Sequence, residues 1–285
     1  MIANRRQMLG YTTAAAALAA LGPLAGRADA ARLPAIGLQL YTIRDMFQAD
    51  PAGTLEKVAK IGYREVEFGG GGYDRMDAAM LRRTMDRVGL KCPSLHIGYD
   101  ALLGRLDASV AMAKALGADT VVLPYMTAEH RNPAAWKAAV ANFNRIAAEL
   151  KKAGLGFAYH NHDFEFTTKA DGVSLYDTLV TDRDPALVRF ELDLFWAVKA
   201  GEDPKALIRR LAGQIYSYHV KDMAADGKMT SVGAGTIDFA SIFALNAVAG
   251  ARHFYVENDA APAPYLPDIT ASFATLSKLR FQPAK

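Results

Sequence analysis

The sequence predicts an α/β protein, a single (β/α)8 TIM barrel formed by residues 31–285. Three observations support this fold. Eight apolar, strand-like runs alternate with amphipathic stretches, as in parallel α/β proteins. The 255 residues of this range match the roughly 250 residues that such a barrel needs. Polar side chains end four consecutive runs at intervals of 33, 26 and 38 residues, close to the ~31 residues of one strand-and-helix unit.

The predicted strands are short and mostly apolar. In chain order they fall at 36–41, 64–68, 91–97, 120–124, 156–161, 188–194, 215–220 and 253–257. Between and after them, apolar residues recur at helical spacing. The predicted helices fall at 55–61, 80–88, 106–116, 133–153, 175–180, from 204, from 238 and at 268–279. Pro133 suits the first position of a helix, Gly154 suits a C-cap and Asp238 suits an N-cap.

The main alternative is an open, doubly wound sheet. Its first strand would lead into G-x-G-x-x-G, and the run at 36–41 does not. The glycines at 69–72 follow the second predicted strand with the wrong spacing for that motif. We interpret them as a flexible loop at the barrel mouth rather than as a phosphate cradle.

Residues 1–30 are typical of an export signal. Arg5 and Arg6 precede an Ala/Leu run at 14–21, and small residues surround a cleavage point at Ala30. The arginine pair resembles a twin-arginine signal. Because the apolar run is shorter than the ~20 residues that span a bilayer, cleavage is favoured over an uncleaved anchor. We expect a periplasmic protein without a stable membrane anchor.

Charge and cysteine content exclude some functions. The chain has a net charge of +3, of which the leader carries +2. The remaining +1, without a basic block, predicts no binding to nucleic acid. Cys92 is the only cysteine, so no internal disulfide forms. The sequence leaves homo-oligomerisation open.

Four side chains that can bind metal end the fifth to eighth predicted strands: His160, Asp193, His219 and Glu257. In a (β/α)8 barrel these strand ends meet on one face, where the chemistry occurs. A lone histidine is more often structural. However, a carboxylate buried in an apolar run is costly unless a cation offsets its desolvation. We therefore expect one metal site, and this donor set suits Mn2+, Zn2+ or Co2+.

Other polar residues lie at comparable strand ends. Those of the first three strands are predicted to bind substrate: Gln39, Glu67 and His96. Because side chains alternate along a strand, His162 shares a face with His160, and Lys221 shares one with His219. Trp196 is also predicted to bind substrate, as an apolar wall for a sugar ring. For each, the alternative is a hydrogen bond at the mouth without a chemical role. The segment containing Asp163, Glu165 and Lys169 is expected to be a solvated loop.

At these residues the chain resembles the xylose isomerase-like TIM-barrel superfamily, in particular its sugar phosphate isomerase/epimerase branch. The similar stretches are IGLQLYTIRD (36–45), KIGYREVEF (60–68), AKALGADTVVLP (113–124), YHNHDFEF (159–166), ELDLFWAVKAGEDP (191–204), YSYHVKDM (216–223) and VGAGTIDF (232–239). The resemblance is specific for the fold and the metal site. It is weak for the substrate, because members isomerise, epimerise, dehydrate or cleave different sugars and polyols.

The resemblance implies a divalent ion, often Mn2+, held by Glu, Asp, His and Glu of strands five to eight. Asp193, His219 and Glu257 match this pattern, whereas His160 stands where the first glutamate is usual. The change removes one charge and one acid/base group, which puts epimerisation by two symmetric glutamates in doubt. His162 or Lys221 could supply the missing group. The six histidines are too few for the three-metal cluster of the related endonuclease IV.

The resulting hypothesis is a metal-dependent sugar isomerase, epimerase or lyase that acts on a keto-sugar or 3-keto-glycoside through an enediolate. Glu257 or His162 would be the base, and the other group, or Lys221, the acid. The expected partner is a small sugar or glycoside. The alternative is a non-catalytic periplasmic carbohydrate-binding protein on the same barrel, which the histidine at position 160 favours.

Overall fold

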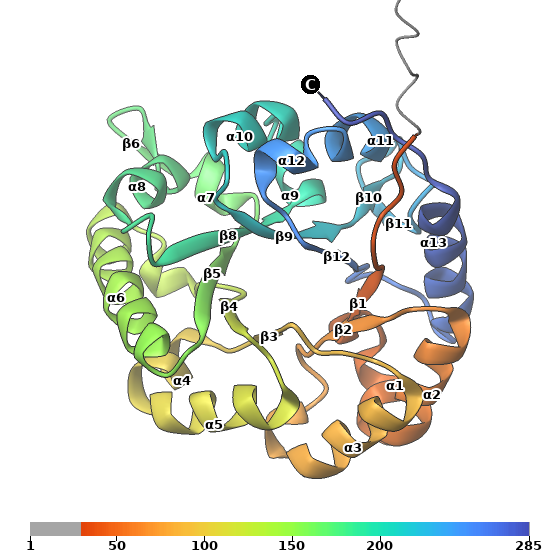
Figure 1. The fold of residues 1–285 in the computed structure, drawn as a ribbon. Helices are drawn as coiled ribbons and strands as arrows, with labels where there is room; N and C mark the ends of the chain where they lie inside the picture. Colours follow the sequence, from red (N-terminus) through yellow and green to blue (C-terminus); the bar gives the residue numbers. More distant parts are fainter. Residues whose placement is uncertain (1–29, 285) are drawn as a thin grey trace, which may run out of the picture.

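The computed structural model describes residues 30–284, which form a barrel of parallel strands surrounded by helices (Figure 1). Around the sheet, the strand order is β2-β1-β12-β9-β8-β5-β4-β3. Bridges from Glu65 to Lys91 and from Phe68 to Leu95 connect the two outer strands and close the barrel. The strands are β1 Gly37–Gln39, β2 Glu65–Glu67, β3 Ser94–His96, β4 Thr120–Leu123, β5 Gly156–His160, β8 Val188–Asp193, β9 Ile215–Val220 and β12 His253–Val256. The predicted fold class is confirmed.

Helices cover the outside of the barrel. They are α1 Arg44–Ala49, α2 Pro51–Ile61, α3 Ala78–Val88, α4 Tyr99–Gly104, α5 Leu106–Leu116, α6 Pro133–Lys152, α7 Phe164–Thr167, α8 Leu175–Asp182, α9 Leu194–Lys199, α10 Pro204–Arg210, α11 Phe239–Phe243, α12 Asn246–Ala249 and α13 Leu266–Lys278. Short 3-10 turns are η1 Leu40–Ile43, η2 Tyr73–Arg75 and η3 Ala128–His130. The hairpins β6 Lys169–Ala170 with β7 Val173–Ser174, and β10 Asp222–Met223 with β11 Met229–Thr230, are separate from the barrel sheet.

The long helix α6 shows how local signals and packing combine. The Asn132 side chain accepts a hydrogen bond from the backbone amide of Ala135, and Pro133 occupies the first turn. On the buried face, the Phe143 ring lies 5.4 Å from the ring of Tyr159 in β5. Trp136 Nε1 donates to the Leu175 carbonyl oxygen at 2.8 Å. These contacts hold β5, and with it His160, against the outer layer.

The helix predicted from Asp238 is interrupted. Asp238 is the N-cap and its side chain accepts the amide of Ser241, as expected. However, the Ala244 carbonyl oxygen accepts the backbone amide of Ala284 at 2.7 Å. Because that carbonyl is used by the end of the chain, the helix stops and resumes as α12. The sequence also did not reveal α1, α4, α7 and α9, the short helices after four of the strands.

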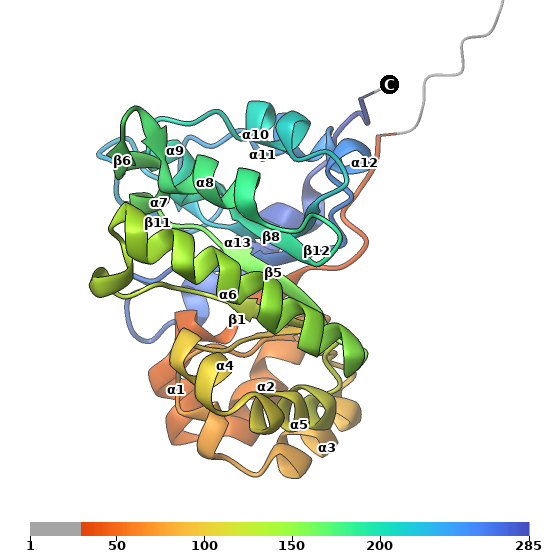
Figure 2. The ribbon, with the colours of Figure 1, turned by 90° about the vertical axis from the view of Figure 1, so that its left-hand side faces the viewer.

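The two ends of the barrel differ. Figure 2 shows the β6 and β11 hairpin strands at one end and the segment that leads into β1 at the other. At this second end, Ala31 and Phe281 exchange two backbone hydrogen bonds of 2.8 and 3.2 Å. The expected export signal lies outside the described residues, except for Ala30. The start of that signal and its cleavage therefore stay predictions.

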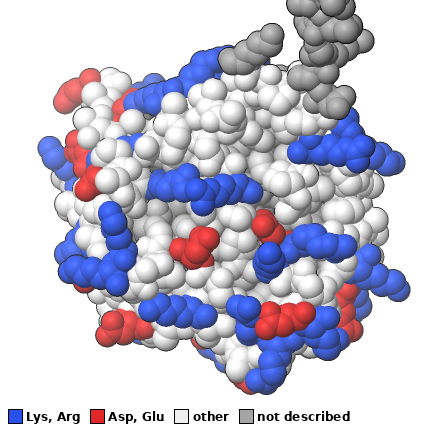
Figure 3. All heavy atoms as spheres, in the orientation of Figure 1, with Lys and Arg blue, Asp and Glu red and all other residues white. Residues whose placement is uncertain are grey.

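On the face shown in Figure 3, lysines and arginines are mixed with acidic residues and uncharged surface. No extended area of a single sign covers this face. Within residues 30–284, none of the helices combines the length and apolarity needed to cross a membrane.

Candidate active site

Side chains that point into the barrel form a column of polar groups. In β9 the alternation places Ser217 and His219 inside, and Lys221 follows on the same side. In β8 the same alternation places Glu191 and Asp193 inside the barrel. All five are nearly inaccessible to solvent. The parallel register of β8 and β9 places these side chains at the same heights along the barrel axis, because Glu191 pairs with Ser217 and Asp193 pairs with His219.

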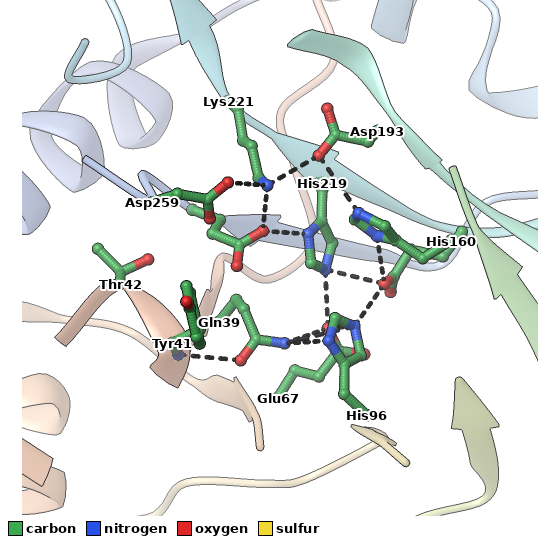
Figure 4. Close-up of polar contacts among 12 residues, drawn as sticks. Gln39, Tyr41, Thr42, Glu67, His96, His160, Asp193, His219, Lys221 and Asp259 are labelled. Atoms are coloured by element: carbon green, nitrogen blue, oxygen red, sulfur yellow. Dashed lines mark hydrogen bonds and ion pairs between the residues drawn. The ribbon is translucent and has the colours of Figure 1, made fainter. Parts of the chain in front are cut away.

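The upper part of this column brings together Asp193, His219 and Glu257. Figure 4 shows Asp193 and His219 with Lys221 beside them. One ligand atom from each lies within 4.8 Å of the others. His219 Nδ1 is 2.6 Å from Glu257 Oε2. Asp193 Oδ2 is buried and has no hydrogen-bond donor in good geometry, although Lys221 Nζ lies 3.2 Å away. Three of the four predicted ligands therefore form one potential metal site.

Lys221 is held by carboxylates. Its Nζ lies 2.7 Å from Glu257 Oε2 and 3.0 Å from Asp259 Oδ2. Burial favours the neutral amine, but Asp193, Glu257 and Asp259 together raise the pKa of Lys221 well above its usual value. Burial also favours the neutral acid of Glu257, yet Lys221 and His219 hold its pKa well below the ordinary range. The site therefore contains a buried ammonium–carboxylate pair.

His160, the fourth predicted ligand, lies between the upper layer of the column, which contains Asp193, and a lower layer, which contains Glu191. Its Nε2 is 3.6 Å from Asp193 Oδ2, and its Nδ1 is 3.1 Å from Glu191 Oε1. Burial and the nearby charge of His219 lower the pKa of His160 to about 3. The ring is thus neutral and can offer a lone pair. It belongs to a second group of potential ligands, which contains His96, His160, Glu191 and His219.

The lower layer fixes the orientation of His219. Its Nε2 lies 2.8 Å from Glu67 Oε2 and 2.9 Å from Glu191 Oε1. Burial disfavours a charged ring, but Glu191 and Glu257 raise the pKa of His219 well above its ordinary value. The two acceptors at Nε2 fix the ring plane, as outer acceptors do for metal-binding histidines, and Nδ1 is the nitrogen on the side of Glu257.

His96 and Gln39 complete this layer. His96 Nε2 lies 3.0 Å from Glu67 Oε2 and 2.8 Å from Glu191 Oε1. Burial opposes the charged ring, but both carboxylates raise the pKa of His96 to about 9. Gln39 Nε2 donates to Glu67 Oε2 at 2.8 Å, and Gln39 Oε1 accepts the backbone amide of Tyr41.

A cavity of about 480 Å3 opens above this column. Its buried part is lined by His96, His160, His162, Lys221, Glu257 and Asp259, and its outer part by Tyr41, Gly69, Gly70, Gly98, Pro124 and Tyr125. The glycine run thus lies at the barrel mouth, as expected. Gln39 and Glu67 lie below the cavity wall. Trp196 packs behind it, with its ring 5.2 Å from that of His162.

His162 lies in the cavity wall beside the metal-ligand group. Burial and the neighbouring His160 lower the pKa of His162 well below its usual value, so the ring is neutral. Its Nδ1 is buried without a hydrogen-bond partner among the described residues. A neutral imidazole with an unused nitrogen can accept a proton.

The interpretation of Glu165 as part of a solvated loop was wrong. Glu165 lies in α7 and is fully buried. It accepts hydrogen bonds from Tyr159 Oη at 2.6 Å and from the backbone amide of His162 at 2.7 Å. Burial raises the pKa of Glu165 to about 8. This carboxyl group positions the backbone that carries His162.

Sequence reasoning missed Glu191 and Asp259. Both were detectable by the two-residue alternation, because Glu191 precedes Asp193 by two positions and Asp259 follows Glu257 by two. The same alternation relates His162 to His160 and Lys221 to His219. They contribute two negative charges to the site.

Comparison with known proteins places the chain in a family. The family of xylose isomerase-like TIM barrels matches residues 55–257, most of the chain. The protein therefore belongs to this family.

Its relatives with curated names are distant. Inosose dehydratase of Geobacillus kaustophilus is 24% identical over 231 residues, which are 67% of this chain and 73% of that protein. Inosose dehydratase of Clostridium beijerinckii is 27% identical over 132 residues, covering 40% of this chain and 43% of that protein. The match thus spans less than half the length of the clostridial relative.

A solved structure confirms the fold. The crystal structure of a sugar phosphate isomerase/epimerase from Parabacteroides distasonis aligns with a TM-score of 0.74 at 23% identity. The alignment covers 87% of this chain and 95% of that chain. At this identity the likeness concerns the architecture.

Proposed function

We propose that the protein is a metal-dependent isomerase, epimerase or lyase that acts on a keto-sugar or 3-keto-glycoside through an enediolate. The observation that carries this proposal is the buried Asp193–His219–Glu257 group beside a charged Lys221 and a neutral His162. Family membership and relatives named as dehydratases support it.

The donor set fits a divalent cation. Two carboxylates and an imidazole converge, and the buried Asp193 Oδ2 has no hydrogen bond of good geometry among the described residues, although Lys221 Nζ lies 3.2 Å away. Asp193, His219 and Glu257 would hold the ion, with the neutral His160 ring beside them. Mn2+ is our first choice, and Zn2+ or Co2+ also suit these ligands. Such an ion would supply Lewis-acid stabilisation of negative charge on a substrate oxygen.

His162 is the group best suited to remove the carbon-bound proton. It lines the cavity, and its ring is neutral and therefore has a lone pair that can accept a proton. Glu257, the other candidate base, is less free to act, because its Oε2 already lies against both Lys221 and His219. Lys221 keeps its proton at Nζ and can hydrogen-bond a substrate oxygen as that atom becomes negative. Removal of the proton next to the carbonyl then yields the enediolate.

The cavity favours a substrate without phosphate. Among the described residues that line it, no arginine is present. Its two cations are already paired, Lys221 with three carboxylates and His96 with Glu67 and Glu191. A phosphate dianion would find no free positive charge here. The predicted export signal is consistent with this, and we propose a periplasmic location.

Exchange of substrate protons with solvent tests the proposal. The protein with Mn2+ should catalyse incorporation of deuterium from D2O into 3-ketoglucose next to the carbonyl, as followed by NMR. Chelation should abolish the exchange, and added Mn2+ should restore it. His162→Gln and the double variant His219→Ala, Glu257→Ala should lose it, whereas the exposed control Glu129→Gln should not. Full exchange in the double variant would contradict the proposed site.

The second candidate function is carbohydrate binding without catalysis. Two observations favour it: the histidine at position 160, and the Lys221 ammonium that already pairs with Asp193 and Glu257. Sugar binding without deuterium uptake, with or without Mn2+, would decide for this function.

A further inference from the structure

The outer part of the cavity carries two exposed aromatic rings. Tyr41 is 39% and Tyr125 is 46% exposed. Within residues 30–284, large hydrophobic side chains with this degree of exposure are few: Tyr41, Leu103, Tyr125 and Val173. Two of these four line the same cavity. Exposed tyrosines concentrated at one opening indicate a contact surface for a ligand.

The strand order explains the shape of this opening. Tyr41 follows β1 and Tyr125 follows β4, so β2 and β3 lie between them in the barrel. The loops after β2 and β3 contribute glycines to the cavity wall, Gly69, Gly70 and Gly98. The two rings therefore flank a part of the mouth with little side-chain volume. The metal-ligand group lies on the other strands, β8, β9 and β12.

Both tyrosine rings are held in place. Arg44 Cζ lies 4.4 Å from the centre of the Tyr41 ring, and Arg44 Nη1 donates to the Tyr41 carbonyl oxygen. The Tyr41 amide donates to Gln39 Oε1, which connects the ring to the buried network (Figure 4). A Cβ at Gly70 would approach Tyr41 Cδ2 to 2.5 Å. Glycine at this position therefore lets the ring lie against the loop.

Tyr125 is supported in the same way. Arg131 Cζ lies 4.6 Å from the centre of the Tyr125 ring, and Arg131 Nε donates to the Met126 carbonyl oxygen. The His162 ring meets Tyr125 at 5.1 Å, nearly edge to face. The exposed tyrosine is thus in direct contact with the group that we propose as the base.

We propose that Tyr41 and Tyr125 form an outer subsite for a second sugar ring, so that the substrate is a glycoside with at least two rings. This inference rests on the proposed function for the position of the reacting ring, which lies at Lys221 and Glu257. The C–H bonds of a pyranose face carry partial positive charge and pack on the negative face of an aromatic ring. Rigid tyrosines provide this contact at a low entropic cost. The cavity volume of about 480 Å3 extends beyond what one reacting ring occupies.

Binding measurements test the subsite independently of catalysis. The probes are glucose, cellobiose and maltose, titrated by calorimetry. At least one disaccharide should bind more tightly than glucose. Tyr41→Ala and Tyr125→Ala should each weaken disaccharide binding by roughly threefold to tenfold and leave glucose binding within about twofold. Tyr125→Phe should keep the preference, and Val173→Ala, an exposed apolar control away from the cavity, should change nothing.

The possible outcomes separate the two proposals. If neither disaccharide binds more tightly than glucose, or if both tyrosine variants weaken all three sugars equally, the subsite is wrong. The deuterium exchange on 3-ketoglucose can still succeed in that case, and the proposed function then stands alone. If exchange fails but the disaccharide preference depends on the tyrosines, the subsite belongs to a binding protein.

Discussion

Lys221 Nζ lies 2.7 Å from Glu257 Oε2, at the point where β9 and β12 end. A buried ammonium therefore touches a carboxylate that is also a potential metal ligand. The pair determines two properties of the site. It stabilises the ionised form of Glu257, and it places a proton donor beside the position where substrate oxygens would bind.

Replacing Lys221 should leave three acidic side chains without their shared cation and so destabilise the protein. In Lys221→Gln, Asp193, Glu257 and Asp259 lose their common cation. Breaking such a buried pair costs about 3–5 kcal/mol of unfolding free energy. Urea unfolding in the presence of chelator should show this loss, and Mn2+ should recover part of it. The exposed control Lys169→Gln should stay close to wild type. Unchanged stability in chelator would show that the three acids do not depend on the ammonium.

Glu191 should control the affinity of the Asp193–His219–Glu257 group for a metal ion without binding the ion itself. It accepts from His160 and His219, so Glu191→Gln leaves both rings with a changed partner. Loss of such an orienting contact typically weakens metal binding by roughly 10–100-fold. Titration with Mn2+ monitored by electron paramagnetic resonance measures this change. Ser217→Ala, which removes only the donor to Glu191 Oε2, should have a smaller effect. Equal Mn2+ affinity in wild type and Glu191→Gln would refute the orienting role.

Stability should depend on pH through Glu165. Its pKa is raised from 4.5 to about 8, mainly by burial, so the folded state binds this proton more tightly than the unfolded state. The stabilisation from proton binding is present at low pH and is lost as pH rises towards 8. The slope reaches about 1.4 kcal/mol per pH unit. Between pH 5 and 8, Glu165→Gln should show a smaller decline in unfolding free energy than wild type. Parallel curves for both proteins would exclude the effect.

Export should depend on the arginine pair. Replacing Arg5 and Arg6 by lysines should stop translocation if the leader is read by the twin-arginine system. Cell fractionation with an antibody against the barrel measures this, and a matched change of Arg27 to lysine serves as the control. Export that continues in the double-lysine variant would point to a different signal.

Regular periodicity explains which features the sequence revealed. The eight strands and the candidate ligands His160, Asp193, His219 and Glu257 follow from short apolar runs that end in polar residues. Parallel strands then bring these ends together. The structure places the four residues at one end of the barrel but divides them between two overlapping groups. That division depends on side-chain directions, which spacing does not define.

Contacts made only in the folded chain explain what the sequence did not reveal. The burial of Glu165 depends on α7 folding back onto Tyr159. The break between α11 and α12 depends on Ala284, far along the chain. Tyr125 resembles any aromatic residue near a strand end, and its position at the cavity opening depends on how the loops fold together. None of these features has a local signature.

The backbone hydrogen bonds between Ala31 and Phe281 hold the two ends of the described chain next to each other. A short peptide could therefore join these two positions covalently. New termini could then be made at Gly172, in the exposed turn between β6 and β7. Such a circular permutant should still fold, because the joined termini lie at the end of the barrel opposite the active site and the new termini open a hairpin that is separate from the barrel sheet.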